Sequence, residues 1–202
     1  LRGLVEPAAE FQTFDLRLQR RDLRADVVFR TPGMRPDVPA LLEAKARGSI
    51  VTSEMEIFFE VCPCTIIGVT GSDGKTTTTS IIAEMLRAAG KTVYLGGNIG
   101  HPLLCDAEKM QPEDFAVVEL SSFQLLDMKS SPHIAVMTNL APNHLDVHKD
   151  MDEYIAAKEN IYLHQHEGDI AIFNEDNDIT RSLSEKVSAR MRLFSRREEV
   201  AD

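Results

Sequence analysis

Long apolar runs are missing from the 202-residue chain, and none approaches the roughly 20 residues that a membrane helix requires. No basic segment followed by an apolar one stands near the first residue, so we expect no secretory signal. Cysteine is scarce as well, and the three present are too few for a disulfide framework. A protein of the reducing cytoplasm, with no membrane partner, is the simplest expectation.

Positive charge is also in short supply, because 22 lysines and arginines stand against 32 aspartates and glutamates, a net charge of −10. Nucleic-acid-binding proteins normally carry a basic field, so that class is disfavoured. Two of the cysteines form the motif Cys62-Pro63-Cys64, which resembles half of a zinc site. A structural zinc site takes four ligands and no second pair exists, so we expect no zinc here.

Strand-like and helix-like segments alternate along the chain. The first unit contains two short strands and two helices, expected at 25–33, 37–48, 49–53 and 54–61. In the first of these helices Asp37 is a candidate N-cap and Gly48 a stop signal. We expect a domain boundary near 62–64, where a proline precedes a new apolar strand.

The second unit has a clearer pattern, with strands expected at 65–70, 91–97, 115–120, 134–140 and 169–174. Ile81, Ile82, Met85, Leu86 and Ala89 recur at helical spacing before Gly90, and 152–165 is another helical stretch. This alternation predicts an α/β fold with a mostly parallel, doubly wound sheet. Ligands of such sheets bind beyond the carboxyl ends of the strands.

The segment "GVTGSDGKTTTTS" (68–80) follows a predicted strand and opens a predicted helix, as a phosphate-binding loop does. The common pattern G-x-x-x-x-G-K-[ST] is met at Gly74, Lys75 and Thr76, but Val69 stands where the first glycine belongs. Gly71 and Gly74 would let several N–H groups face one anion, at the positive end of the helix.

In such a loop Lys75 reaches the terminal phosphates and the Thr76 hydroxyl binds Mg²⁺. The alternative is a plain helix start capped by Ser72 or Asp73. That alternative does not explain why Gly-Lys-Thr follows at once.

Polar side chains follow three further predicted strands. Glu119 ends a buried strand and suits a nucleotide-bound Mg²⁺, although a solvated strand-end acid is the simpler alternative. Asn98 lies in "GGNIGHP", where a turn residue is equally expected. His144 lies in "TNLAPNHLDVH"; a single histidine is usually structural, but Lys75, Glu119 and His144 all fall at one edge of the predicted sheet.

Lys158 projects from the apolar face that Tyr154, Ile155, Ile161 and Tyr162 form on the helical wheel. It either extends to the edge of the helix or is buried, and burial lowers the pKa of an amine. A neutral amine can react with CO₂ to give a carbamate, which is an anionic oxygen ligand. The sequence permits this chemistry without requiring it.

The motifs "TGSDGKTTT", "ELSSFQL", "NHLDVH" followed by "YIAAK", and "TPGMRPDVP" together resemble the Mur ligases of peptidoglycan synthesis. The segment "SSFQL" resembles the branch that adds D-glutamate to UDP-N-acetylmuramoyl-L-alanine. The resemblance implies ATP-dependent ligation through an acyl phosphate, with a P-loop-type central ATPase domain preceded by a small Rossmann-like domain.

By matching positions, the resemblance implies a role for each candidate residue. The ATP phosphates would be held by Gly71, Ser72, Asp73, Gly74, Lys75, Thr76 and Thr77. One Mg²⁺ would be held by Thr76 and Glu119, and a second by His144 and a carbamylated Lys158. The UDP-sugar would contact Asn98, Ser121 and Gln124. Lys75, His144 and Lys158 would be the catalytic residues, in a protein expected to be monomeric.

Two departures from the family pattern matter. Asp73 stands where these ligases often have asparagine, and an extra carboxylate beside phosphates is unfavourable unless it turns away. The chain also lacks the first strand and glycine turn of the uridine domain and stops at Asp202. The resemblance therefore implies a fragment: a partial uridine-nucleotide domain at 1–62, a truncated ATP-binding domain at 63–202, and no amino-acid-binding domain.

Two other interpretations remain open. A sister Mur ligase or a folylpolyglutamate synthase shares the loop but differs at "SSFQL". A nucleotide-binding module without activity of its own is the third possibility.

Overall fold

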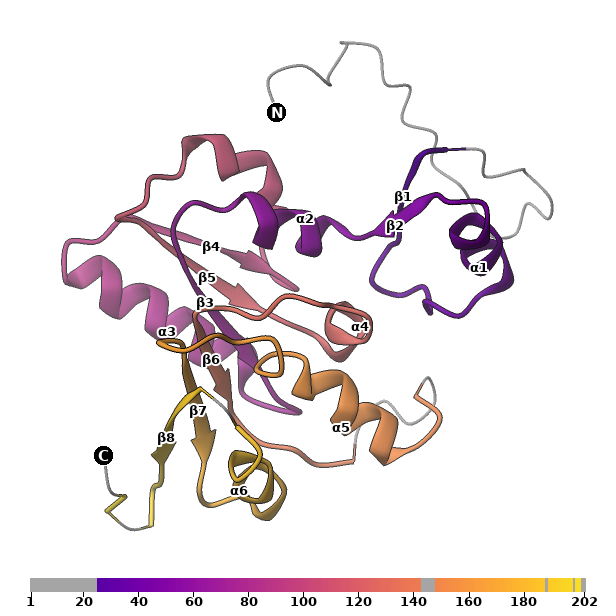
Figure 1. Ribbon diagram of the computed structural model, residues 1–202. Helices are drawn as coiled ribbons and strands as arrows, with labels where there is room; N and C mark the ends of the chain where they lie inside the picture. The colour runs from indigo at the N-terminus through magenta and orange to yellow at the C-terminus, as the bar shows by residue number, and fades with distance from the viewer. Residues whose placement is uncertain (1–24, 143–147, 188, 198, 201–202) are drawn as a thin grey trace.

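A computed structural model of the chain describes residues 25–142, 148–187, 189–197 and 199–200 (Figure 1). In these ranges a six-stranded sheet has the order β4-β5-β3-β6-β7-β8, and a separate two-stranded sheet pairs β1 with β2. Every neighbouring pair of strands is parallel. The predicted α/β fold with a parallel sheet is therefore confirmed.

The large sheet is built around β3 (Thr65–Thr70), which pairs with β5 (Phe115–Glu119) on one side and β6 (Ile134–Met137) on the other. From β3 the chain crosses to β4 (Val93–Gly97), returns to β5, and then moves to the far side of β3. The last strands there are β7 (Ile170–Asn174) and β8 (Arg190–Phe194). The strand order thus reverses at β3, where doubly wound sheets bind their ligands.

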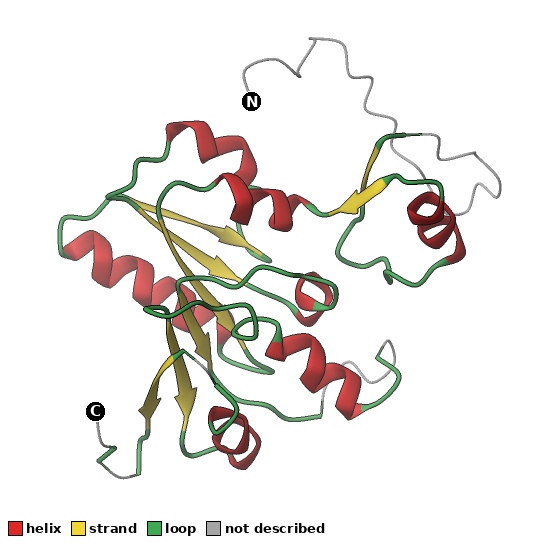
Figure 2. Cartoon of the chain, in the orientation of Figure 1, coloured by secondary structure: helices red, strands yellow, loops and turns green. Residues whose placement is uncertain are grey.

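Helices cover both faces of the sheet (Figure 2). On one face Ile67 and Val69 of β3 pack against Ala83 of α3 (Lys75–Ala88). On the other face Ile66 belongs to a larger apolar core. That core includes residues of five further helices, which are α2 (Glu54–Val61), the 3₁₀ helix η1 (Leu103–Lys109), α4 (Ser122–Leu125), α5 (Met151–Glu159) and α6 (Asp178–Ser184).

The smaller unit consists of β1 (Val27–Phe29), α1 (Pro39–Ala46) and β2 (Ile50–Thr52). It joins the larger unit through α2, whose Phe58 is fully buried in the core of the large sheet. Ion pairs also connect the two, from Arg35 to Glu153 of α5 at 2.8 Å and from Lys45 to Asp127 at 3.2 Å. The expected domain boundary near 62–64 stays a prediction.

Two local expectations need correction. Asp37 does not cap α1: the N-cap is Val38, which makes no side-chain cap bond, and the Asp37 carboxylate accepts a hydrogen bond from Arg35 at 3.0 Å. The helix expected at 152–165 ends at Glu159, and hydrogen-bonded turns continue to Gln165. Over the described ranges, no helix has both the length and the apolar character needed to cross a bilayer.

Candidate functional site

The loop between β3 and α3 turns sharply at Gly71, whose φ of +152° is a conformation that side chains rarely adopt. A Cβ atom at this position would collide with Thr138 Oγ1. The loop therefore lies directly against the segment that follows β6. Glycine at 71 is required both by the backbone angle and by this close approach.

Hydrogen bonds from that neighbouring segment fix the loop. Asn139 accepts from the backbone N–H of Ser72 through its carbonyl and from that of Asp73 through its side chain, both at 2.9 Å. The Ser72 hydroxyl donates to the Ala141 carbonyl at 2.9 Å and lies 3.0 Å from the Tyr154 hydroxyl. Asp73 is exposed to solvent. The loop is thus hydrogen-bonded to the segment after β6 and to α5.

The first turn of α3 carries no side-chain cap. Its N-cap is Gly74, with φ of +76°, and no side chain bonds the open N–H groups there. The alternative of a plain cap by Ser72 or Asp73 is therefore wrong. The first N–H groups of a helix have no partner within it, so those of Lys75, Thr76 and Thr77 are left available as hydrogen-bond donors.

Glu119 joins the phosphate loop to the end of β4. Its buried carboxylate accepts from Thr76 Oγ1 at 2.7 Å and from Asn98 Nδ2 at 2.9 Å. Gly97 precedes Asn98, and a Cβ at that glycine would collide with the carbonyl oxygen of Glu119. The carboxylate is therefore held between the first turn of α3 and the residue after β4, rather than solvated as in the simpler alternative.

Lys158 is the most buried cation of the site, with 1% of its surface exposed. Its ammonium donates to Thr70 Oγ1 at 3.1 Å and to the Gly71 carbonyl at 2.9 Å, and it lies 4.9 Å from the centre of the Tyr154 ring. Burial lowers the pKa of Lys158 to about 7, helped by the charge of Lys75 and opposed by that of Glu119. The lysine does not extend to the helix edge.

Lys75, the first residue of α3, binds the same loop as Lys158 of α5. Its ammonium donates to the carbonyls of Gly71 at 3.0 Å and Ser72 at 2.9 Å. Both lysines therefore donate to the Gly71 carbonyl. Two cations so close together create a positive site that favours an anionic ligand.

A cavity of about 180 Å³ brings together four of the predicted residues from four separate segments of the chain. It is lined by Lys75, Asn98, Ser121, Ser122, Phe123, Tyr154 and Lys158. Ser121 caps α4 and is bonded reciprocally to Gln124, whose N–H donates to the Ser121 hydroxyl at 3.3 Å while its side chain accepts from the Ser121 N–H at 3.0 Å.

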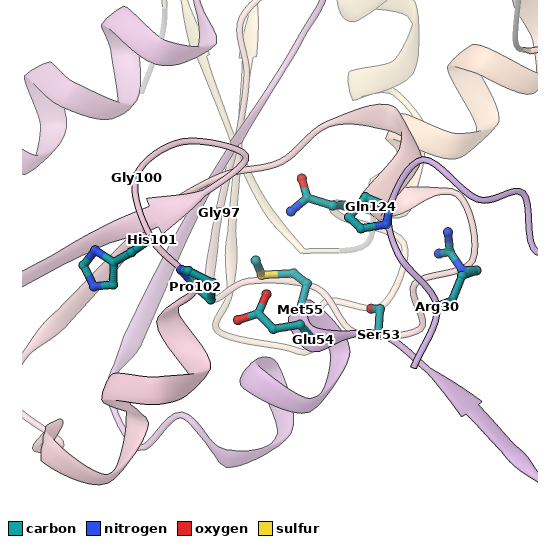
Figure 3. Close-up of a pocket in the computed structure, with 10 residues that line it drawn as sticks. Arg30, Ser53, Glu54, Met55, Gly97, Gly100, His101, Pro102 and Gln124 are labelled. Atoms are coloured by element: carbon teal, nitrogen blue, oxygen red, sulfur yellow. The ribbon is translucent and has the colours of Figure 1, made fainter. Parts of the chain in front are cut away.

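A second cavity, of about 310 Å³, lies between the small unit and the large sheet (Figure 3). Side chains from α2, from α4 and from the loop after β4 surround it, with Gln124 and Arg30 among its lining residues. Burial lowers the pKa of Arg30, although the charges of Asp127 and Glu56 oppose this effect. Gly97 and Gln124 line this cavity, and their neighbours in the chain, Asn98 and Phe123, line the first one, so the two cavities lie side by side.

Among the predicted residues, His144 lies outside the described part of the chain. Asn139 and Tyr154 are the important additions: both hold the loop, and neither was expected to do so. His148 is a third, buried between Phe123 and Tyr154, with Nε2 at 2.9 Å from the Ser122 hydroxyl. The only available sequence signal was their position in or after the segments at 138–148 and 152–165.

Comparison with known families gives one match, to the Mur ligase middle domain, over residues 69–202. The chain is 50% identical to a UDP-N-acetylmuramoylalanine–D-glutamate ligase of Clostridium novyi, over 98% of the chain and 44% of that protein. It is 55% identical to the protein of the same name from Acetivibrio thermocellus, over 85% of the chain and 37% of that protein. The chain thus spans less than half the length of these relatives.

Solved structures share the fold at much lower identity. A MurF ligase from Thermotoga maritima, in complex with ADP, superposes with a TM-score of 0.59 at 23% identity, over 80% of this chain and 38% of that one. UDP-N-acetylmuramate:L-alanyl-gamma-D-glutamyl-meso-diaminopimelate ligase from Neisseria meningitides has a TM-score of 0.59 at 18% identity, over 85% and 58%.

Proposed function

The chain belongs to the Mur ligase family, and from this premise we propose that the protein is an ATP-dependent ligase joining D-glutamate to UDP-N-acetylmuramoyl-L-alanine in peptidoglycan biosynthesis. ATP would phosphorylate the substrate carboxylate, and the amine of D-glutamate would attack the acyl phosphate and release phosphate. The names of the relatives at about half identity support this substrate pair.

One observation carries the proposal: the uncapped start of α3 brings Lys75 into the same cavity as Lys158, and the next residue, Thr76, is hydrogen-bonded to Glu119. The N–H groups of Lys75, Thr76 and Thr77 would bind phosphate oxygens, in the loop formed by Gly71, Ser72, Asp73 and Gly74. The Lys75 ammonium, now bonded to loop carbonyls, would turn to the transferred phosphate and offset its charge. The exposed Asp73 carboxylate would stay outside.

The residues also fit Mg²⁺, which prefers oxygen ligands such as carboxylates and hydroxyls. Thr76 and Glu119 supply a hydroxyl and a carboxylate 2.7 Å apart. Mg²⁺ bound there would neutralise charge on the phosphates. For a second ion we propose His144 and a carbamate on Lys158, supported by the complete burial of an amine that has no carboxylate hydrogen-bonded to it among the described residues.

For the UDP-sugar we propose a path across both cavities. Asn98 and Ser121 line the smaller cavity beside Lys75, and Gln124 lines the larger one. Arg30 supplies a buried positive charge in the larger cavity that suits a diphosphate. We further propose that 1–62 and 63–202 belong to separate domains and that the protein is a cytoplasmic monomer.

The nucleotide site is tested by thermal unfolding of this chain with ATP and MgCl₂. We expect a rise in the melting temperature, because a ligand that binds the folded state stabilises it. Lys75→Ala should abolish the rise. Lys109→Ala, which removes an exposed lysine paired with Asp106, should leave it intact. An unchanged rise in Lys75→Ala would move the phosphate site elsewhere.

The reaction is tested by ADP release from a longer polypeptide that contains this chain and is as long as its relatives. Release should require both the UDP-sugar and D-glutamate. Release with a folate substrate and none with the UDP-sugar would instead favour a folylpolyglutamate synthase. The 202-residue chain alone should bind nucleotide without forming the amide, and product detected by mass spectrometry would contradict that expectation.

A further inference from the structure

Three sulfur atoms from two distant parts of the chain meet beside the segment that links α2 to β3. Cys62 Sγ lies 3.5 Å from Cys64 Sγ and 3.8 Å from Met110 Sδ. Cys64 Sγ lies 4.0 Å from the same Met110 sulfur. The atoms therefore form a nearly equilateral triangle.

The backbone explains why the three sulfurs converge. Cys62 is the C-cap of α2, with its N–H bonded to the Phe58 carbonyl at 2.9 Å, and Pro63 turns the chain before Cys64 enters the core. Met110 is the C-cap of η1, which packs against α2. Cys64 and Met110 are 2% and 3% exposed, whereas Cys62 is half-buried and gives solvent a way to the triangle.

The size of the triangle suits a bound metal ion. A point equidistant from sulfurs 3.5, 3.8 and 4.0 Å apart lies about 2.2 Å from each, close to the ~2.3 Å of zinc–thiolate bonds. The ligands are two thiols and a thioether, which are soft donors of the kind that selects Cu(I). In the described part of the chain no group of three histidine, cysteine or acidic side chains is placed to hold a metal, and the triangle itself offers no oxygen ligand to a hard ion.

We propose that Cys62, Cys64 and Met110 form a three-sulfur site for a soft monovalent cation of the Cu(I) class. On binding, the two thiols release their protons to solvent and bind as thiolates, and the Met110 thioether completes the set. The bound ion would tie the linker between α2 and β3 to the end of η1. The competing explanation is simple packing of sulfur in an apolar core.

The test is anaerobic titration of the 202-residue chain with Cu(I) in competition with a chromophoric Cu(I) chelator. We expect one Cu(I) per chain, three sulfur neighbours at about 2.2–2.3 Å by X-ray absorption, and a higher melting temperature with the ion bound. The matched control is Cys105→Ser, which removes the exposed third cysteine and should leave the affinity unchanged.

Three variants separate the site from mere packing. Cys62→Ser and Cys64→Ser should lose the tight binding. Met110→Leu conserves volume and apolar character, so it should fold normally yet bind Cu(I) more weakly by about tenfold or more. Circular dichroism without metal checks folding. Unchanged affinity in Met110→Leu, loss of binding in Cys105→Ser, or no competition with the chelator would each overturn the three-sulfur site.

Discussion

Thr76 Oγ1 donates to Glu119 Oε2 at 2.7 Å, so the first turn of α3 is bonded to the end of β5. A hydroxyl and a carboxylate in contact are the ligands that we propose for Mg²⁺. Glu119→Gln keeps an acceptor for Thr76 but removes the charge. We expect the thermal stabilisation by ATP to lose its dependence on Mg²⁺ in this variant, while a smaller, metal-independent stabilisation persists.

The matched control is Glu84→Gln. Glu84 is an exposed acid on α3 that pairs with Arg87 at 2.6 Å, so its replacement should leave the Mg²⁺ dependence intact. A full Mg²⁺ effect in Glu119→Gln would show that the ion is held by other groups.

The Lys158 carbamate has a direct spectroscopic test. With ¹³C-labelled bicarbonate, we expect a carbamate resonance from the chain that disappears in Lys158→Ala. Lys91→Ala, which removes an exposed lysine, should retain it. In the longer polypeptide that contains this chain, Lys158→Ala should abolish ligase activity, and a short-chain carboxylic acid should partly restore it. Full activity of Lys158→Ala without the acid would contradict the carbamate proposal.

The lowered pKa of Lys158 also predicts how stability varies with pH in CO₂-free buffer. Burial, with Lys75 adding to it and Glu119 opposing it, lowers the pKa from 10.5 to about 7. Between these values the unfolded chain binds the proton and the folded chain does not, so folding becomes more favourable as pH rises from about 7 to 10, by at most about 1.4 kcal/mol per pH unit.

Lys158→Met removes this titration. The free energy of unfolding, measured with urea from pH 7 to 9, should rise less with pH, or fall more, in Lys158→Met than in the parent chain. Lys91→Met should follow the parent. Parallel pH profiles for the parent and Lys158→Met would mean that the lysine keeps its proton in the fold.

Much of the fold follows from local pattern. The bounds of β3 and α2 match the expected segments 65–70 and 54–61, and for β3 the reason is that a continuous apolar run is a strong signal of a buried strand. By contrast, α6 has no marked apolar repeat in "DITRSLS", and β8 alternates arginines with apolar residues at the sheet edge. Neither element was expected, because α6 lacks the apolar repeat of a helix and an edge strand such as β8 needs little apolar character.

The candidate site also contains residues that the sequence identified and residues that it did not. Lys75 and Glu119 were identifiable because each follows a strand, and parallel strands end at one edge of the sheet. The bonds that Asn139 and Tyr154 make to the loop join residues more than 60 positions apart, and such contacts leave no periodic pattern in the sequence. The approach of Met110 to the cysteine pair was hidden for the same reason.

The turn at Gly71 gives a prediction about stability. Gly71→Ala places a side chain at φ +152° and against Thr138 Oγ1, which itself donates to the Asp73 carbonyl at 2.7 Å. Strain and overpacking together should cost about 3 kcal/mol, measured by urea unfolding. Nucleotide binding should weaken too, because the loop shifts.

Gly74→Ala is the control for this effect. Gly74 also has a positive φ, of +76°, but a Cβ there meets nothing within 4 Å. Its cost should be limited to about 1–2 kcal/mol of backbone strain. Equal losses in the two variants would mean that the contact with Thr138 is unimportant.

The ion pair between the small unit and α5 predicts a second pH effect. Arg35 binds both oxygens of Glu153, at 2.8 and 3.0 Å, and these hydrogen bonds lower the pKa of Glu153 to about 2. A depressed carboxyl pKa stabilises the fold above the unfolded value of 4.5, and this contribution is lost as pH falls towards 2. Glu153→Gln should therefore lose less stability than the parent between pH 5 and 3, because its amide does not titrate.

The control is Glu43→Gln, which replaces an exposed acid of α1 that lies 3.9 Å from Arg47. This variant should keep the acid sensitivity of the parent. Identical acid profiles for Glu153→Gln and the parent would show that the pair between Arg35 and Glu153 does not hold the two units together in solution.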